Sequence, residues 1–144
     1  MKYRIKKLSI CDYNDLIGLW KRSGLPTRPN GRDSYEAIGK EIERGETCFL
    51  GMFDKDKLIG VIIGTSDGRK GWINRLTIDP DYRGQGLAIK LIEEGEKFLF
   101  GLGIKIIAGL IEDYNAPSKA LFKKVGYRMH DDIFYFTKRL SDDV

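Results

Sequence analysis

The chain has 144 residues, about the length of one domain, and 42% of them are hydrophobic while 32% are charged. No apolar run approaches the roughly 18 residues that a membrane-spanning helix needs, and the charged residues 1–7 lack the apolar core of a signal peptide. These features argue against a membrane protein, and we expect a single cytoplasmic domain over residues 1–144.

The cysteine, histidine and charge content limits the possible chemistry. Cys11 and Cys48 lack the spacing of metal ligands, and the one histidine, His130, excludes a histidine-cluster metal site and makes a Ser-His-Asp hydrolase a poor fit. The net charge of +4 suits an anionic ligand but is too evenly spread to indicate nucleic acid. We therefore expect no metal and no nucleic-acid partner.

The first third of the chain predicts one strand and two helices. Residues 3–9 supply the apolar positions of a strand, and Asp12 or Asn14 can cap a helix whose apolar residues recur at helical spacing. A loop with two prolines and two glycines follows, and Asp33 or Ser34 can then start a second short helix.

The middle of the chain changes to strand-like patterns. Residues 47–53 and 58–65 are apolar and rich in β-branched residues, and the polar run 54–57 joins them as a hairpin. A turn at residues 66–71 leads into a further strand at 72–78. Three successive strands without a helix between them predict an antiparallel meander.

The remaining elements predict the fold class. We expect, in order, a helix from Leu87 to about 102, a strand at 104–111, a helix at 116–125, and strands at 127–129 and 133–140. The predicted fold is therefore α/β (α+β): a mixed sheet with an antiparallel amino-terminal half and a central β-α-β unit.

The stretch from Leu76 to Ala88 (LTIDPDYRGQGLA) is the most informative part of the chain. It reads as a strand, a turn, a glycine-rich bend and the start of a helix. Gly84 and Gly86 leave room for a bulky anion to approach the backbone, and Arg83 adds a charged donor. The amides of residues 84–89 are those that a helix start leaves unpaired, so this point suits a phosphate or pyrophosphate.

Two common phosphate-binding motifs do not fit this stretch. The dinucleotide fingerprint needs a third small residue where this chain has Ile89, and it usually belongs to an early β-α-β unit. No Gly-Lys-Ser/Thr follows the glycines, so a Walker A loop is excluded.

Two separated motifs together resemble the GNAT superfamily of N-acetyltransferases. The run Arg83-Gly84-Gln85-Gly86-Leu87-Ala88 is similar to the family's R/Q-x-x-G-x-G/A signature, and the run from Asn115 to Phe122, ending in Val125-Gly126-Tyr127, is similar to its second conserved segment. The order of elements also matches, with helices expected on both faces of the sheet. Asp67-Gly68-x-x-Gly71 and the region of Trp20 and Arg28-Pro29 resemble the YpeA-like subgroup.

The resemblance implies acetyl-CoA as cosubstrate. In the family the pyrophosphate lies on the arginine-glycine loop, and the pantetheine arm runs beside the preceding strand. The residues that would bind the cofactor here are Leu76, Thr77, Ile78, Arg83, Gly84, Gln85, Gly86, Leu87, Ala88, Ile89, Asn115 and Ser118.

The resemblance accounts for fewer of the catalytic groups than of the cofactor-binding residues. The backbone amide of Ile78 would polarise the thioester carbonyl. Family members often carry a glutamate at the positions of Trp72 and Leu110 here, so Glu112 or Asp113 is the nearest base. A family tyrosine that protonates the thiolate is replaced by Phe122, and the tyrosines that could substitute for it are Tyr114, Tyr127 and Tyr135.

The amine acceptor is expected over the first two helices and their loop. Strand alternation predicts that only one of Asn74 and Arg75 faces it. The groups that could line it are Trp20, Arg28, Asn30, Arg32 and Tyr35.

Three functions follow from these observations. The first is an acetyl-CoA-dependent N-acetyltransferase that moves the acetyl group directly to a primary amine in a ternary complex. The second, suggested by Phe122 and the missing glutamates, is a catalytically idle acyl-CoA binding or sensing module. The third is a modifier that docks on an acidic macromolecular partner. Members of the family are frequently dimers, so a homodimer is also expected.

Overall fold

The computed structural model describes residues 2–142 of the chain, which falls into two compact units, residues 1–109 and 110–144. Each unit is described by itself. Two short 3₁₀ helices lie at Ile10–Asp12 and Pro80–Tyr82. The other elements are, in chain order, β1 (Arg4–Lys7), α1 (Tyr13–Arg22), α2 (Tyr35–Glu43), β2 (Cys48–Asp54), β3 (Lys57–Ser66), β4 (Gly71–Ile78), α3 (Leu87–Gly101), β5 (Ile107–Gly109) and α4 (Ala116–Lys124).

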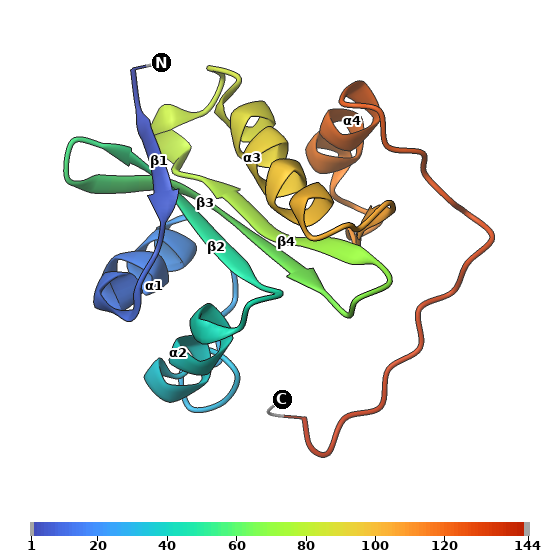
Figure 1. Ribbon diagram of the computed structural model, residues 1–144, viewed down its shortest axis with the longest axis horizontal. Coiled ribbons are helices and arrows are strands. Elements are labelled where there is room, and N and C mark those ends of the chain that lie inside the picture. The colour runs from blue at the N-terminus through green and yellow to red at the C-terminus, as the bar shows by residue number, and fades with distance from the viewer. Residues whose placement is uncertain (1, 143–144) are drawn as a thin grey trace. The chain divides into compact units, whose positions relative to one another are not determined.

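The first unit is built on one five-stranded sheet with the order β1-β2-β3-β4-β5 (Figure 1). The first four strands pair antiparallel, and β5 pairs with β4 in parallel. A parallel neighbour requires a crossover connection, and α3 supplies it between β4 and β5. The predicted α+β class, with an antiparallel first half and a central β-α-β unit, is confirmed.

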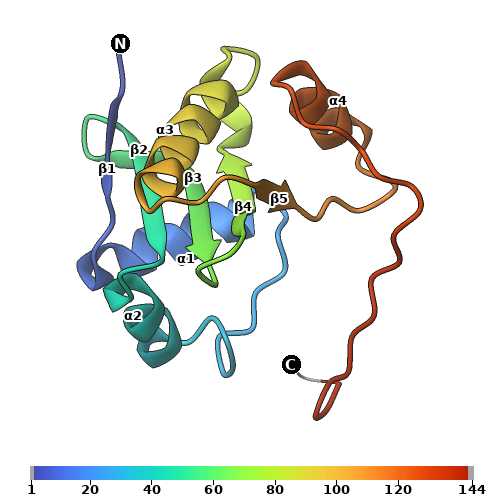
Figure 2. The same ribbon diagram turned by 45° about the vertical axis from the view of Figure 1, so that its right-hand side comes forward.

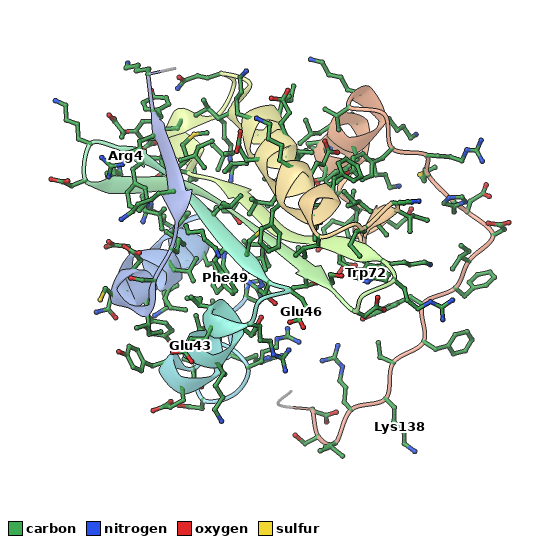
Figure 3. All side chains as sticks on the ribbon, viewed as in Figure 1. Arg4, Glu43, Glu46, Phe49, Trp72 and Lys138 are labelled. Carbon is green, nitrogen blue, oxygen red and sulfur yellow. The ribbon has the colours of Figure 1, made fainter. Side chains whose placement is uncertain are left out.

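Helices cover both faces of this sheet (Figures 1 and 2). Because successive strand residues point to opposite faces, Val61 and Ile63 of β3 pack with α1, while Ile62 between them lies against Gly95 of α3. The core on the α1 and α2 face includes Leu16, Leu19, Trp20, Ile38 and Phe49, the last labelled on β2 in Figure 3. Burying each large apolar side chain contributes about 1.5–3 kcal/mol relative to its exposure.

Glycine lets α3 approach the sheet closely. A Cβ atom on Gly95 would lie 3.3 Å from the terminal methyl carbons of both Ile62 and Ile73. Leu91 and Leu99 of α3 are fully buried beside this contact. This packing holds α3 against β3 and the first half of β4.

Two predictions about strands are wrong. The strand expected at 104–111 is reduced to Ile107–Gly109, and the strands expected at 127–129 and 133–140 are absent from the described residues. The aromatic and β-branched residues there favour extended backbone, but a strand also needs a neighbouring strand, and none of the strands in the described residues pairs with them. The side chains of residues 133–140 are exposed, with 71% of Ile133 and 90% of Phe136 accessible.

Candidate active site

The glycine loop, residues 83–86, joins a short 3₁₀ turn to the start of α3. Gly84 and Gly86 have φ values of +82° and +74°, a left-handed conformation that other residues adopt only with strain. Gly86 is the N-cap of α3 and makes no side-chain cap bond. The first amides of α3 therefore lack both intrahelical and capping partners, and the first turn holds no acidic residue. The loop is exposed, whereas Leu87 behind it is buried.

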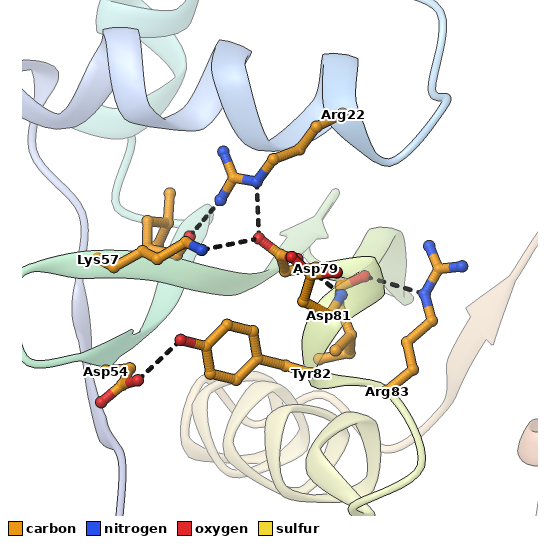
Figure 4. A network of polar contacts seen from close by, with 9 residues as sticks. Arg22, Asp54, Lys57, Asp79, Asp81, Tyr82 and Arg83 are labelled. Atoms are coloured by element: carbon orange, nitrogen blue, oxygen red, sulfur yellow. Dashed lines mark hydrogen bonds and ion pairs between the residues drawn. The ribbon is translucent and has the colours of Figure 1, made fainter.

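Asp79 fixes the turn that precedes this loop. Its carboxylate is only 1% exposed and accepts hydrogen bonds from the Asp81 amide at 2.9 Å and from Arg22 Nε at 2.7 Å. Lys57 Nζ lies 3.8 Å away (Figure 4). Burial alone would raise the pKa of Asp79, but the Asp81 amide and the Arg22 guanidinium outweigh it, so the pKa is lowered. The ionised carboxylate thus joins α1 and the β2–β3 hairpin to the turn.

Tyr82 adds a second tie between the turn and the hairpin. Its hydroxyl donates to Asp54 Oδ2 at 2.8 Å (Figure 4). Its ring meets that of Tyr3 edge-on, with centroids 5.8 Å apart. The bond to the Asp54 carboxylate raises the pKa of Tyr82 to about 12. The Tyr3 hydroxyl in turn donates to Gln85 Oε1 at 3.3 Å, inside the glycine loop.

Beside this loop, β4 has an open edge, residues 74–78. The pairing with β5 ends at Ile73, so no strand of the described residues covers this edge. The Asp79 amide donates to the Ile59 carbonyl at 2.7 Å on the β3 side. Since backbone groups alternate between the two edges of a strand, Ile78 directs its N–H and C=O toward the open edge and Thr77 directs its own toward β3.

Arg83 connects the glycine loop to this open edge. Its Nε donates to the Ile78 carbonyl at 3.2 Å, which agrees with the outward direction of the Ile78 peptide groups (Figure 4). Thr77 is buried and its hydroxyl donates to the Arg75 carbonyl at 2.9 Å. The unpaired backbone N–H groups of the open edge of β4 and those at the start of α3 therefore lie at the two ends of the short segment that joins these elements.

A β-bulge in β4 changes which side chains face α1 and α2. Arg75 and Leu76 lie together opposite the single residue Ile62 of β3, and Arg75 has a φ of +47°. The bulge interrupts the alternation of side chains, so Asn74 and Arg75 both line the same cavity. The prediction that strand alternation turns one of these side chains inward and the other away is wrong for this reason.

This cavity, hereafter the sheet–helix cavity, has a volume of about 200 Å³. Its apolar wall consists of Trp20, Ile38, Phe49 and Ile63. Its polar groups are Arg32, Asp33, Glu41, Thr65, Asn74 and Arg75. Asn74 Nδ2 donates to Thr65 Oγ1 at 3.2 Å. The cavity therefore combines a flat apolar wall with charges of both signs.

The sequence-based set of lining groups is partly found there. Trp20 and Arg32 line the cavity, whereas Arg28, Asn30 and Tyr35 do not. Asp33 and Glu41 were missed as lining residues. Glu41 follows Ile38 by three positions, so its place on the buried face of α2 was a signal that helical spacing could have provided.

The remaining candidates belong to the second unit. Asn115 caps α4, with its Oδ1 accepting from the Ser118 amide at 3.2 Å. Glu112 is exposed and Tyr114 is 84% exposed. Asp113 pairs with Lys119 Nζ at 2.9 Å, and this hydrogen bond lowers the pKa of Asp113. Of the two carboxylates, Glu112 is thus the one without this cationic partner.

Phe122 occupies a packing position within α4. It is buried, and its ring meets Tyr127 edge-on with centroids 5.0 Å apart. Tyr127 thus provides an aromatic packing surface for Phe122. Aromatic pairs in this geometry contribute about 0.5–1.5 kcal/mol beyond the area they bury.

The described residues, 2–142, contain neither a metal-binding cluster nor a membrane-spanning helix. No group of three or more His, Cys, Asp and Glu side chains among them is arranged to hold a metal ion. Within the same residues, no helix has the length and apolar character that crossing a membrane requires.

Comparisons with known proteins agree with this geometry. Residues 13–127 match the model of the acetyltransferase (GNAT) family. The acetyltransferase SG1711 of Sodalis glossinidius (strain morsitans) is 32% identical over 132 residues, which cover 92% of each chain. The crystal structure of the PaiA N-acetyltransferase from Thermoplasma acidophilum in complex with coenzyme A superposes with a TM-score of 0.80 at 26% identity, covering 91% of this chain and 92% of that one.

The fold is shared more widely than the sequence. The structure of AAC(6')-Iy in complex with a bisubstrate analogue gives a TM-score of 0.81 at 17% identity, covering 96% of this chain and 99% of the other. The family match spans both motifs, the glycine loop and the segment that contains α4. The chain therefore belongs to the acetyltransferase (GNAT) family of acetyl-CoA-dependent N-acetyltransferases.

Proposed function

We propose that the glycine loop and the open edge of β4 bind acetyl-CoA, and that the acetyl group passes directly to an amine held in the sheet–helix cavity. The observation that carries this proposal is the position of the open edge, immediately before a loop with two left-handed glycines and an uncapped helix start. The amides of residues 84–89 would bind the pyrophosphate, and Leu76 and Ile78 would pair with the pantetheine arm. The coenzyme A in the PaiA neighbour supports this assignment.

The reaction would use the Ile78 amide as its electrostatic group. The nitrogen of the neutral amine attacks the thioester carbon, the carbonyl oxygen takes the negative charge, and the Ile78 N–H stabilises it. The C–S bond then breaks, CoA leaves as a thiolate that accepts a proton, and the product amide nitrogen loses one. An alkyl amine has a pKa of about 10, so its neutral form at pH 7 costs roughly 4 kcal/mol unless a base or a desolvating site assists.

We assign the proton transfers to Glu112 as base and Tyr114 as acid. Asp113 is a weaker candidate because Lys119 lowers its pKa. Phe122 has no ionisable group, and Tyr127 packs against it. If the assignment is correct, Glu112→Gln removes the acidic limb of the pH profile of kcat/KM, and Tyr114→Phe lowers kcat at constant acetyl-CoA affinity. The matched control Asp113→Asn should keep the acidic limb of the kcat/KM profile and the kcat of the parent protein. An unchanged pH profile in Glu112→Gln would exclude the base role, and an unchanged kcat in Tyr114→Phe would exclude the acid role.

The cofactor assignment is tested by Gly86→Glu. The carboxylate would meet the phosphates at the helix start, and the left-handed backbone would be strained as well. We expect acetyl-CoA affinity, measured by calorimetry, to fall at least about a hundredfold, since phosphates gain most of their binding from such amides. Gly68→Glu, also left-handed (φ +88°) but in the β3–β4 turn, is the control. Unchanged affinity in Gly86→Glu would remove the phosphate site.

A thiol-release assay with acetyl-CoA separates catalysis from binding alone. Release of free CoA thiol on addition of an amine identifies the transferase, whereas binding without release across amine classes identifies the idle module. The assay should be carried out on residues 1–144, which we propose to act as one domain. The family match over residues 13–127 supports this, because it includes parts of both compact units.

We also propose membership of the YpeA-like subgroup and a homodimer. For the subgroup, Asp67 and Gly68 form the β3–β4 turn, with Asp67 Oδ1 accepting from the Arg69 amide at 2.8 Å.

For the dimer, the exposed apolar segment 133–136 is of the kind that marks protein interfaces. Light scattering on the double variant Phe134→Ser/Phe136→Ser should show a monomer, while the control Phe100→Ser on exposed α3 stays dimeric. A monomeric parent protein would exclude the dimer.

A further inference from the structure

We propose that the sheet–helix cavity accepts a small amine that also carries a carboxylate, which the Trp20 indole N–H and the Arg75 guanidinium would bind together. The inference rests on the proposed function, because it treats this cavity as the acceptor site. It adds the chemical class of the acceptor.

Trp20 supplies the first unsatisfied donor. Its side chain is 0% exposed, it lines the cavity, and its Nε1 has no hydrogen-bond acceptor among the described residues. A buried donor without a partner is unfavourable, and native proteins satisfy almost all of them with protein, water or ligand. An indole N–H can only donate, so the missing partner must be an acceptor such as a carboxylate oxygen.

Arg75 supplies the second unsatisfied donor beside the first. Its guanidinium carbon lies 4.7 Å from the centre of the Trp20 ring. Its Nη2 donates to the Pro26 carbonyl at 2.8 Å and lies 3.9 Å from Asp33 Oδ2, while its Nη1 is buried and has no partner. One terminal nitrogen is therefore anchored, and the other is a buried donor that lacks an acceptor. Burial lowers the pKa of Arg75, and an anion at Nη1 would offset that effect.

The other charged groups of the cavity leave this position available to an anion. Asp33 is already engaged, since its Oδ2 accepts from the Arg28 amide at 2.7 Å. Glu41 is the second carboxylate of the lining, and its pKa is raised by burial. Arg32 adds a second positive charge to the lining. A polycationic amine would meet two arginines there, whereas a carboxylate is attracted by both.

The size and position of the cavity limit the acceptor further. Its volume of about 200 Å³ is below the 300–1,000 Å³ typical of sites for drug-sized ligands, so the molecule is of amino-acid size. Arg75 directly precedes Leu76, in the segment that forms the open edge of β4. An acceptor anchored by its carboxylate at Arg75 would thus be held beside the strand that is proposed to carry the acetyl group.

The first experiment compares amines that differ only by a carboxylate. L-lysine is paired with cadaverine and L-alanine with ethylamine, and binding to the full chain is measured by calorimetry with and without CoA. We expect the carboxylate member of each pair to bind about tenfold more tightly, because it alone gains charge-assisted hydrogen bonds. Equal affinities within each pair, or no binding of either carboxylate compound, would overturn the proposal.

The indole N–H signals of the two tryptophans distinguish binding at Trp20 from a nonspecific effect on the whole protein. Each gives one indole N–H signal in a nitrogen-15 NMR spectrum, and the Trp72→Phe variant assigns them. Titration with L-lysine should shift the Trp20 signal and leave that of Trp72, while cadaverine shifts neither. A shift of both signals, or of none, would contradict binding at Trp20.

Variants of Arg75 test its contribution. Arg75→Met should reduce the affinity for L-lysine about tenfold and leave that for cadaverine within twofold, whereas Arg75→Lys, which keeps the charge, should lose less. Arg69→Met, an identical change in the exposed β3–β4 turn, is the control. Thermal melting verifies that each variant folds. Equal losses for both ligands in Arg75→Met would overturn the proposal.

These outcomes are separate from those of the proposed function. Absence of acetyl-CoA binding or of thiol release with every amine would refute the transferase assignment, while the carboxylate preference is measured without turnover. Thiol release with carboxylate-free amines only would keep the transferase and refute the acceptor class.

Discussion

The Nε of Arg22 donates a 2.7 Å hydrogen bond to Oδ2 of Asp79, and this bond joins the end of α1 to the turn that leads into the glycine loop. The same guanidinium donates through Nη2 to the Leu58 carbonyl at 2.7 Å. One arginine therefore connects a helix, a strand and the turn before α3. The position of the glycine loop depends on residues that are distant from it in the sequence.

We expect Asp79→Asn to destabilise the fold by about 1–3 kcal/mol, because the charged acceptor of buried hydrogen bonds is lost. Urea unfolding at pH 7 measures this difference, and Asp56→Asn in the exposed hairpin is the control. The folded-state pKa of Asp79 is lowered, so its contribution is fully present above the unfolded-state pKa of about 4 and is lost as the pH falls through the folded-state value. A difference in unfolding free energy that does not shrink as the pH falls below about 4 would contradict this account.

For Tyr82, we expect the phenol to titrate near pH 12, because the Asp54 carboxylate accepts its proton in a hydrogen bond. The raised pKa means that this bond stabilises the fold below pH 10, the ordinary tyrosine value, and that the effect disappears as the pH rises through 12. Ultraviolet difference spectra follow the ionisation, with Tyr82→Phe identifying the signal. Asp54→Asn should move this pKa toward 10, and an unmoved titration would exclude Asp54 as the cause.

Gly86→Ala should destabilise the protein by about 1 kcal/mol. No atom lies within 4 Å of the added methyl carbon, so the cost comes from the φ of +74° and not from a clash. Gly45→Ala is a matched control, since it too has open space and its φ is outside the left-handed region. Thermal melting compares the two variants. Equal melting temperatures would show that a side chain at position 86 does not strain the backbone there.

In α3, we expect Gly95→Leu to cost about 1–3 kcal/mol through overpacking, since even a Cβ there would lie 3.3 Å from Ile62 and Ile73. At Gly101, in the same helix, nothing lies within 4 Å, and Gly101→Ala should leave stability unchanged or raise it by up to about 1 kcal/mol. Chemical denaturation of both variants is the measurement. A stable Gly95→Leu protein would mean that α3 can move away from the sheet.

Local patterns were sufficient for most elements and for the cofactor motif. The local pattern predicted α1, α2, α3 and α4, and Ser34, one of the two caps proposed for α2, is observed as its N-cap. The glycine loop was recognisable because its residues are adjacent in the chain and because left-handed backbone strongly favours glycine. Such features depend on neighbours within a few positions.

The features that the sequence did not reveal depend on contacts between distant segments. The carboxyl-terminal residues 133–140 have the composition of a strand, but strand formation requires a partner that composition does not specify. The bulge that turns Asn74 and Arg75 to one side arises from the pairing of β4 with β3, which interrupts the regular alternation.

The sequence by itself determined the α+β fold and the position of the glycine loop, because these follow from short-range periodicity and from glycines at fixed spacing, and two motifs in it resemble the family to which the chain belongs. Only the tertiary structure decided that Trp20 and Arg75 lie together with unsatisfied N–H groups at a cavity. Those two residues are separated by a loop, a helix and two strands, and burial that leaves a donor unpaired is a property of the packed molecule, not of either residue.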